Sequence, residues 1–592
     1  MSCTKKPPLA RSYPSTIPNS CRWRSHPMSG TPASSRSAAH ATARSFVAAS
    51  AGPANRSKRS PVRAYRSTIA ARSKLAGPLG SATTPSRVPR QKWNACPVSP
   101  ITACRGRSIP ACRRMPSSAA AALVQFGASS IPGILPIAFQ SSLPPHPAGR
   151  PPLAPSPPIR TMRLHPRGGP MSDYEITTLP NGLRVITATM PSTQAASVNI
   201  FVGVGSRSEP RHLNGITHFL EHMVFKGTEK RPTAIQIAQE IEGAGGTLNA
   251  YTNKEFTCYW NIVPFDRFPT AIDVAADMLL NSKLEQQEIE RECPVVQQEL
   301  KRNHDNPAAW AARLIGQAVY GPQPAGWDVG GTVELVATWK REDFISHIRE
   351  WYKPGNIVLS VAGNVTHQQV LEYAVPLLGG MEPGPIPPVQ PYDPAVTGPR
   401  VVTESRPIDQ CTLYLGLPIF GRDDPDRYIL RILNDVLGAG MSSRLFLEVR
   451  ERRGLAYSVS SGYGYLSDAG VFTISAGVNR DRLCETIQVC LAEADRLVRE
   501  PVPPDELRKA KDHNIGRFRL SLETAFAIGQ RNGELLLTKG RVETIDEVVA
   551  AIEAVTPDDI QRVAARIFDR AKLHAAVVGP NLDEAEIEAA LG

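Results

Sequence analysis

The sequence predicts an α+β protein made of two homologous α/β sandwich domains behind a disordered N-terminal extension. Three observations predict it: a change in composition near residue 170, an internal repeat after it, and helices and strands that come in runs. Strict alternation of strands and helices would instead indicate a doubly wound sheet. We expect an extension at 1–170, an N-terminal domain at 171–378, a linker at 379–400 and a C-terminal domain at 401–592.

The extension has an unusual composition. Residues 1–170 contain 25 Lys and Arg but no Asp or Glu, and they show no sustained apolar period. Such a segment cannot bury enough apolar surface to offset chain entropy, so we expect disorder. A transit peptide and nucleic-acid binding are alternatives, but the segment is long and proline-rich, and its scattered basic residues form no named nucleic-acid-binding motif. We favour a translation start at Met171, with residues 1–170 absent from the native protein.

The rest of the chain has the composition of a folded protein. Residues 171–592 hold the other 42 of the 67 Lys and Arg residues and all 55 Asp and Glu residues, a net charge of −13. Their five cysteines show no CxxC spacing, which indicates reduced thiols of an intracellular protein. We expect a cytoplasmic location in a bacterium, with the mitochondrial matrix as the alternative. We expect no membrane span, because prolines interrupt the apolar run at 119–139.

An internal repeat defines the two domains. RVITATMP from Arg184 resembles RVVTESRP from Arg400, an offset of 216 residues, and the same offset relates Gly363 of NIVLSVAGNV to Gly579 of LHAAVVGPNL. One offset at both ends indicates two copies of one domain. The segment 379–400 between them is rich in Pro and Gly, as is typical of a linker.

Hydrophobic periodicity predicts the elements of the first copy. Alternating or continuous apolar residues indicate strands, and amphipathic stretches indicate helices. Gly215 and Gly227 bracket the first helix. The expected strands are 185–188, 196–204, 246–251, 256–263 and 356–362, and the expected helices are 215–226, 233–243, 266–281, 286–303 and 341–351.

The first helix contains a metal-binding pattern. In ITHFLEHMVFKG, His218 and His222 are four residues apart and therefore lie on one helix face, with Glu221 close to that face. A single histidine there would more often be an ordinary core residue, but His-x-x-Glu-His is the inverted zinc-peptidase signature. The corresponding helix of the second copy, YILRILNDVLGAG, has no histidine. We therefore expect one metal site per chain.

A catalytic zinc usually has three protein ligands, and the helix at 286–303 supplies candidates for the third. Glu292 and Glu299 are seven residues apart on one face, and Cys293 lies about 100° away from Glu292. The spacing alone leaves the choice open, and exposed glutamates without a metal are the simpler interpretation of each.

The motif from His218 to His222, together with Glu299 later in the chain, resembles the pitrilysin and insulinase-type zinc metallopeptidases. The two-domain length is similar to the short form of this family, which includes the mitochondrial processing peptidase β subunit and its bacterial relatives. Three further stretches resemble the family: LPNGLRV at 179–185, GGTLNAYTNKEFTCY at 245–259 and SRLFLEVRERRGLAYSVSS at 443–461. The resemblance spans nearly all of 171–592. Cys293–Pro294, which we expect to break the helix, is a departure from the family pattern.

The resemblance implies a role for each matching residue. His218, His222 and Glu299 would bind one zinc ion per chain, Glu221 would be the general base, and Glu292 a supporting carboxylate. Asn249 and Ala250 would hold substrate backbone, and Arg450 and Tyr457 would act from the second domain. The site residues implied are thus His218, Glu221, His222, Asn249, Ala250, Glu292, Glu299, Arg450 and Tyr457.

The expected function is a zinc-dependent endopeptidase that cleaves extended or unfolded peptides with metal-activated water and a glutamate base. Net negative charge favours basic peptides. We expect a homodimer or a heterodimer with a related chain, and no nucleic acid. The alternative is a non-catalytic scaffold subunit of the same fold, although such subunits tend to lose metal-site residues.

Overall fold

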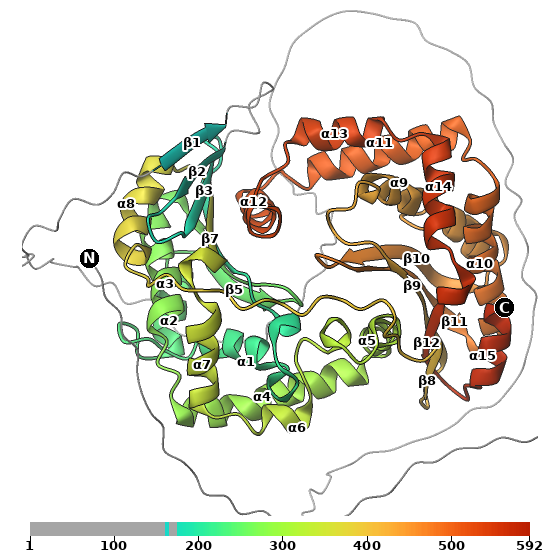
Figure 1. The fold of residues 1–592 in the computed structure, drawn as a ribbon, viewed down its shortest axis with the longest axis horizontal. Helices are drawn as coiled ribbons and strands as arrows, with labels where there is room; N and C mark the ends of the chain where they lie inside the picture. The colour runs from blue at the N-terminus through green and yellow to red at the C-terminus, as the bar shows by residue number, and fades with distance from the viewer. Residues whose placement is uncertain (1–159, 165–173) are drawn as a thin grey trace, which may run out of the picture. The chain divides into compact units, whose positions relative to one another are not determined.

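A computed structural model of the chain describes residues 160–164 and 174–592. The first of two mixed sheets has the strand order β1-β2-β3-β7-β4-β6-β5, which leaves β5 at an edge. Figure 1 shows this sheet in the half drawn from teal to yellow. Its strands are β1 Arg160–Leu164, β2 Tyr174–Thr178, β3 Arg184–Thr189, β4 Ala195–Val202, β5 Thr247–Thr252, β6 Thr257–Pro264 and β7 Ile357–Gly363.

The second sheet repeats the first. Its order, β10-β11-β9-β12-β8, matches β5-β6-β4-β7-β3 strand for strand. The register repeats too, because Val185 pairs with Leu359 and Val401 pairs with Ala575, each at the offset of 216. The predicted fold class is therefore confirmed. The strands are β8 Val401–Ser405, β9 Gln410–Ile419, β10 Ala456–Tyr465, β11 Gly470–Asn479 and β12 His574–Gly579.

Helices pack on both faces of each sheet. Most helices of each half form one large apolar core with their own sheet. In the first half they are α1 Ile216–Met223, α2 Ala234–Glu242, α3 Phe268–Asn281, α4 Gln286–Asp305, α6 Val333–Val336, α7 Arg341–Trp351 and α8 His367–Leu378. In the second they are α9 Arg427–Leu437, α10 Leu483–Arg499, α11 Pro504–Leu520, α13 Ile545–Glu553, α14 Pro557–Ile567 and α15 Glu584–Leu591.

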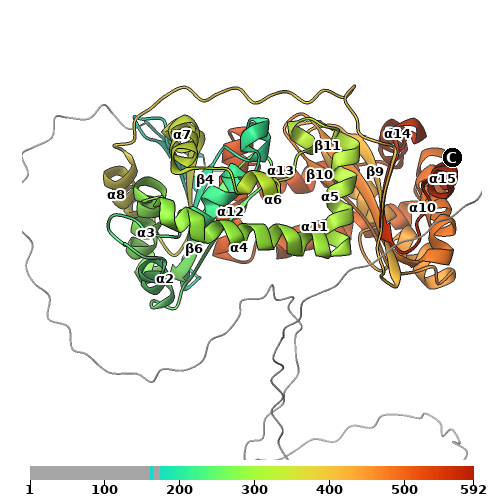
Figure 2. The same cartoon turned by 90° about the horizontal axis from the view of Figure 1, so that it is seen from below.

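The other face of each sheet is covered by a helix from the opposite half. Helix α12, Ala525–Lys539, packs on β4 and β7 of the first sheet, and α5, Pro307–Tyr320, packs on β12 and β9 of the second. The two helices lie beside these sheets in Figures 1 and 2. The halves therefore complete one another's cores. Residues 379–400, which join them, contain neither helix nor strand.

The five strands and five helices predicted in the first half are confirmed. The predicted disorder is wrong at Arg160–Leu164, which form β1 and pair antiparallel with β2. The free edge of β2 offers backbone groups to any strand beside it, whatever the side-chain pattern of that strand. Hydrophobic periodicity therefore gave no signal for β1. All other residues of the predicted extension lie outside the described residues. No helix among the described residues is long and apolar enough to span a membrane.

Candidate metal centre

The start of α1 is fixed by glycine geometry and a buried carboxylate. Gly215 has φ +105°, in the left-handed region that favours glycine, and a Cβ there would lie 2.5 Å from the carbonyl oxygen of Gly330. Glu209 accepts hydrogen bonds from the backbone N–H groups of Gly215 at 2.6 Å and Thr217 at 2.8 Å. These bonds satisfy free donors at the helix start, where negative charge is favourable. The helix that presents the two motif histidines is therefore firmly anchored.

The second contributing helix, α4, is continuous. It contains Pro294, so the expectation that this residue breaks the helix is wrong. Proline removes one backbone hydrogen bond, but the buried apolar residues Ile289 and Val296 hold the helix against the core on both sides of it. Glu292 and Glu299 consequently remain on one helix face.

Three side chains converge between α1 and α4. Glu299 Oε2 lies 3.9 Å from His218 Nε2 and 3.4 Å from His222 Nε2, and one ligand atom from each residue falls within 4.8 Å of the others. Three ligands of a tetrahedral zinc at about 2.0–2.1 Å would lie about 3.3 Å apart. Two imidazole nitrogens and one carboxylate oxygen at this spacing fit zinc with small side-chain movements.

Glu292 lies behind the histidines rather than among the three. Its Oε1 lies 3.0 Å from His222 Nδ1, and Lys226 Nζ donates to its Oε2 at 2.5 Å. Burial lowers the pKa of His222, but hydrogen bonds to Glu292 and Glu299 outweigh it and raise that pKa to about 9. Cys293 points elsewhere, with Sγ 3.7 Å from the carbonyl oxygen of Val336. Of the three candidates for the third ligand, only Glu299 approaches the Nε2 atoms of both histidines.

The environment of His218 differs from that of His222. Its Nδ1 atom is buried and has no hydrogen-bond partner among the described residues. A Cβ added to Gly330 would lie 3.6 Å from this atom, so the glycine backbone packs close to the ring. Burial, with the charge of His222, lowers the pKa of His218. A neutral imidazole is the form that coordinates a metal.

Glu221 lies beside the three donors and is held by strand β5. Thr252 Oγ1 donates a hydrogen bond of 2.7 Å to Glu221 Oε2. Burial raises the pKa of Glu221, while the bond from Thr252 and the charge of His222 lower it. A carboxylate with a raised pKa close to a metal site can accept and return a proton near neutral pH.

Strand β5 offers an open edge next to Glu221. Ala250 N–H donates to the side-chain oxygen Oδ1 of Asn249 at 2.8 Å instead of to another strand. Asn249 is exposed, and Ala250 is largely buried. An edge with a backbone donor of this kind can pair with an extended peptide.

Arg450 and Tyr457 lie in the second half, near and within the start of β10. Arg450 lies over the Tyr457 ring, 5.2 Å from its centroid, and Tyr457 is 77% exposed. The contacts described for this pair do not include the three donors or Glu221. The structure thus brings together the predicted residues of the first half but shows no contact between them and this pair.

Sequence reasoning missed several supporting residues. Lys226 follows His222 by four residues, so helical spacing could have placed it on the same face. Thr252 follows Ala250 by two residues in a strand and thus shares its side of the sheet. Glu209 and His347, whose Nε2 lies 3.0 Å from Thr217 Oγ1, had no local signal because their roles depend on tertiary packing.

Known proteins resemble the chain along most of its described length. Residues 184–332 match the family model of insulinase, peptidase family M16, and residues 338–514 match that of the peptidase M16 inactive domain. An uncharacterized zinc protease of Streptomyces coelicolor is 36% identical over 417 residues, which are 69% of this chain and 90% of that protein.

Two solved structures share the fold. A protease from Helicobacter pylori has a TM-score of 0.64 at 23% identity, over 69% of this chain and 100% of that one. A chain of complex III from Candida albicans has a TM-score of 0.61 at 19% identity, over 70% and 99% of the two chains. Identities this low support the fold alone.

Proposed function

The chain belongs to the insulinase family of peptidases, M16, and on that premise we propose that it is a zinc-dependent endopeptidase for extended or unfolded peptides. The main support is the grouping of three metal-donor atoms within 4.8 Å beside the partly buried carboxyl group of Glu221. Relatives named zinc proteases support the choice of metal.

His218, His222 and Glu299 would hold one zinc ion per chain. A zinc ion in such a site lowers the pKa of bound water to about 7 and polarises the scissile carbonyl. Glu292 acts through His222: its bond to Nδ1 orients the ring so that Nε2 faces the site. Lys226 in turn fixes Glu292.

Glu221 is the general base of this proposal. It takes a proton from the attacking water and returns it to the leaving amine. Thr252 holds one oxygen of its carboxyl group, which keeps the other free for this transfer. Burial favours its neutral form and so brings its pKa closer to the working pH.

The substrate lies along β5 in this proposal. Its backbone pairs with the free edge of the strand, and Ala250 N–H exchanges the Asn249 side chain for a peptide carbonyl. Tyr457 and Arg450 then act on the scissile carbonyl from the second half, after a closing movement or from a partner chain. We propose a dimer, with an identical or related chain, as in processing peptidases.

Metal removal and restoration test the proposal. Chelation should abolish cleavage of unfolded peptides by the full chain, and activity should return in a linear titration that ends at one zinc per chain. The double variant His218→Ala, His222→Ala should neither bind zinc nor recover. A zinc-loaded parent that cleaves no peptide of a broad set would instead favour the scaffold alternative, for which the match to an M16 inactive domain is an argument.

A further inference from the structure

A cavity of about 800 Å³ lies between the end of β5 and elements of the second half. Asn253, on its wall, directly follows Thr252, the residue that donates to Glu221. The wall continues over α5 and over α9, β10, α11 and α12 of the second half. A peptide held on β5 can therefore extend into this cavity.

The wall of the cavity is rich in basic side chains, unlike the chain from residue 171 onward. Three acidic residues line it: Glu255, Glu534 and Glu543. The basic residues are twice as many: Lys254, Arg422, Arg427, Arg431, Arg531 and Lys539. Glu255 forms an ion pair with Arg422, and Glu543 forms ion pairs with Arg427 and Lys539. Two of the three acidic residues are thus neutralised by ion pairs with basic residues of the same wall.

Two arginines remain without a carboxylate partner. Arg431 and Arg531 both lie over the ring of Phe518, at 5.2 and 5.5 Å from its centroid. Among the described residues neither guanidinium forms an ion pair, although Arg531 donates to the backbone carbonyl of Glu543. The nearby Asp435 is bound by Asn514 and lies 3.5 Å from His513. Two guanidinium groups thus share one ring, and neither has a carboxylate within ion-pair distance among the described residues.

A third donor in the same wall also lacks a partner. Tyr465 Oη is buried, and no acceptor for its hydrogen is present among the described residues. Its charge environment includes Asp424 as well as Arg427 and Arg431. A buried hydroxyl without a partner is costly, so an acceptor supplied by a ligand would be favourable.

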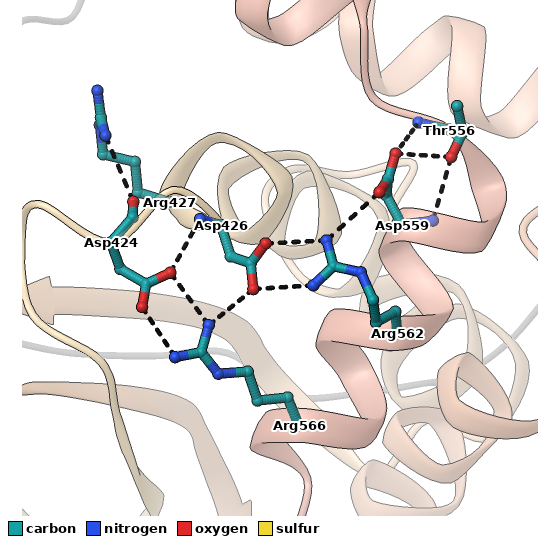
Figure 3. A network of polar contacts seen from close by, with 7 residues as sticks. All are labelled: Asp424, Asp426, Arg427, Thr556, Asp559, Arg562 and Arg566. Atoms are coloured by element: carbon teal, nitrogen blue, oxygen red, sulfur yellow. Dashed lines mark hydrogen bonds and ion pairs between the residues drawn. The ribbon is translucent and has the colours of Figure 1, made fainter.

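The arginine-bearing helix is rigidly fixed. Figure 3 shows that Arg562 and Arg566 of α14 grip the turn before α9: Arg562 bonds both oxygens of Asp426, at 2.9 and 3.0 Å, and Arg566 bonds Asp426 at 2.7 Å and Asp424 at 2.8 Å. Helix α9 follows the second-half counterpart of β4, as α1 follows β4. In the second half the helix at this place in the fold bears Arg427 and Arg431, and it has no histidine.

We propose that this cavity binds a carboxylate group of the peptide substrate through Arg431, Arg531 and the hydroxyl of Tyr465. The guanidinium fork matches a carboxylate in geometry and charge. The inference rests on the proposed peptidase function and gives it a substrate class: peptides with an acidic side chain, or a free C-terminus, at a fixed distance from the cleaved bond. It is opposite to the preference for basic peptides expected from the net charge of −13.

Matched peptide pairs test this subsite in the zinc-loaded full chain. C-terminally amidated peptides of one sequence carry either Glu or Gln at one position, which is moved along the peptide, and another pair differs only in a free or amidated C-terminus. We expect at least one pair to differ about tenfold or more in kcat/KM, as for a hydrogen bond to a charged group. The double variant Arg431→Gln, Arg531→Gln should reduce that ratio to within about twofold of one.

Arg519→Gln is the matched control. Arg519 is exposed, neighbours Phe518 on α11 and does not line the cavity, so the ratio should stay at the parent value. If the double variant does not fold, Arg431→Gln and Arg531→Gln are measured separately. A parent ratio near one for every pair, or a ratio unchanged in the variants, would overturn the proposal.

Binding separates this inference from the peptidase proposal. Affinities of the same peptides for the chelated, metal-free parent are measured by fluorescence anisotropy. If no peptide is cleaved but an acidic peptide binds about tenfold more tightly than its amide, and the double variant abolishes the difference, the subsite stands while the peptidase proposal fails. Equal affinities for every pair overturn the subsite.

Discussion

At the scale of single residues, Glu292 and Glu299 share a helix face but have different surroundings. Glu299 approaches both histidine Nε2 atoms, whereas Glu292 bonds to Nδ1 of His222 and to Lys226. We expect Glu292→Gln to weaken zinc binding about 10–100-fold, as removal of a supporting carboxylate does. Glu299→Gln should weaken it further, because a charged ligand is lost.

Competition with a chromophoric chelator measures both zinc affinities. Glu290→Gln is the control, since Glu290 is exposed on the same helix and bonds only to Gln286 among the described residues. Zinc binding that survives in Glu299→Gln but is abolished in Glu292→Gln would reverse the ligand assignment.

Tyr457 is exposed and has a cation–π contact rather than a described hydrogen bond. If its hydroxyl stabilises the developing oxyanion, Tyr457→Phe should lower kcat by about 10²-fold or more and leave zinc content and the thermal midpoint unchanged. Steady-state kinetics with saturating peptide measure the loss. Tyr373→Phe, at a less exposed tyrosine in the first half, should keep parent activity. An unchanged kcat in Tyr457→Phe would remove this residue from the proposed site.

At the scale of elements, helix α12 packs so closely on the sheet of the other half that a larger side chain at the contact should destabilise the fold. A Cβ at Gly533 would lie 2.2 Å from the Phe201 ring of β4, so Gly533→Ala forces the helix off the first sheet. We expect a loss of about 1–3 kcal/mol in the free energy of unfolding, typical of overpacking. Denaturant unfolding measures it.

Gly516→Ala on α11 is the matched control for Gly533→Ala. A Cβ there meets no atom within 4 Å, so the alanine should stabilise the helix by about 0.5–1 kcal/mol. Equal effects of the two substitutions would contradict the described packing of α12.

Five strands and five helices of the first half could be predicted because each has its own hydrophobic period or caps, whereas β1, β2, α5, α6 and α8 were not predicted. Periodicity shows that a helix has an apolar face but not what covers that face, so the exchange of α5 and α12 between the sheets had no local signal. The expectation that Pro294 breaks its helix was likewise wrong, because core contacts on both sides of this residue keep α4 continuous. Tertiary packing decided each of these cases.

The same limit applies to the site. Helical spacing predicted His218, His222 and the two α4 glutamates, but only the packing of α1 against α4 separates Glu299 from Glu292. The basic cavity could not be predicted from net charge, because charge summed over the chain does not say which side chains face one another.

At the scale of the whole molecule, the two copies have diverged around one framework. They keep the same strand order and register, and each covers a sheet face of the other through α5 and α12. The first copy groups the metal donors, and the second contributes Tyr457 and the unpaired arginines of the cavity. One chain thus combines a proposed reaction centre with a proposed substrate-selecting wall.

In the proposed zinc-dependent cleavage, Glu221 moves the proton without binding the metal. The most direct measurement is the turnover of an unfolded peptide by Glu221→Gln, with zinc content and peptide affinity measured on the same sample and exposed Glu242→Gln as control. We expect one zinc per chain, parent-like peptide binding and a loss in rate of at least about 10²-fold, while the control keeps parent activity. Parent-like turnover by Glu221→Gln with zinc bound would contradict the account.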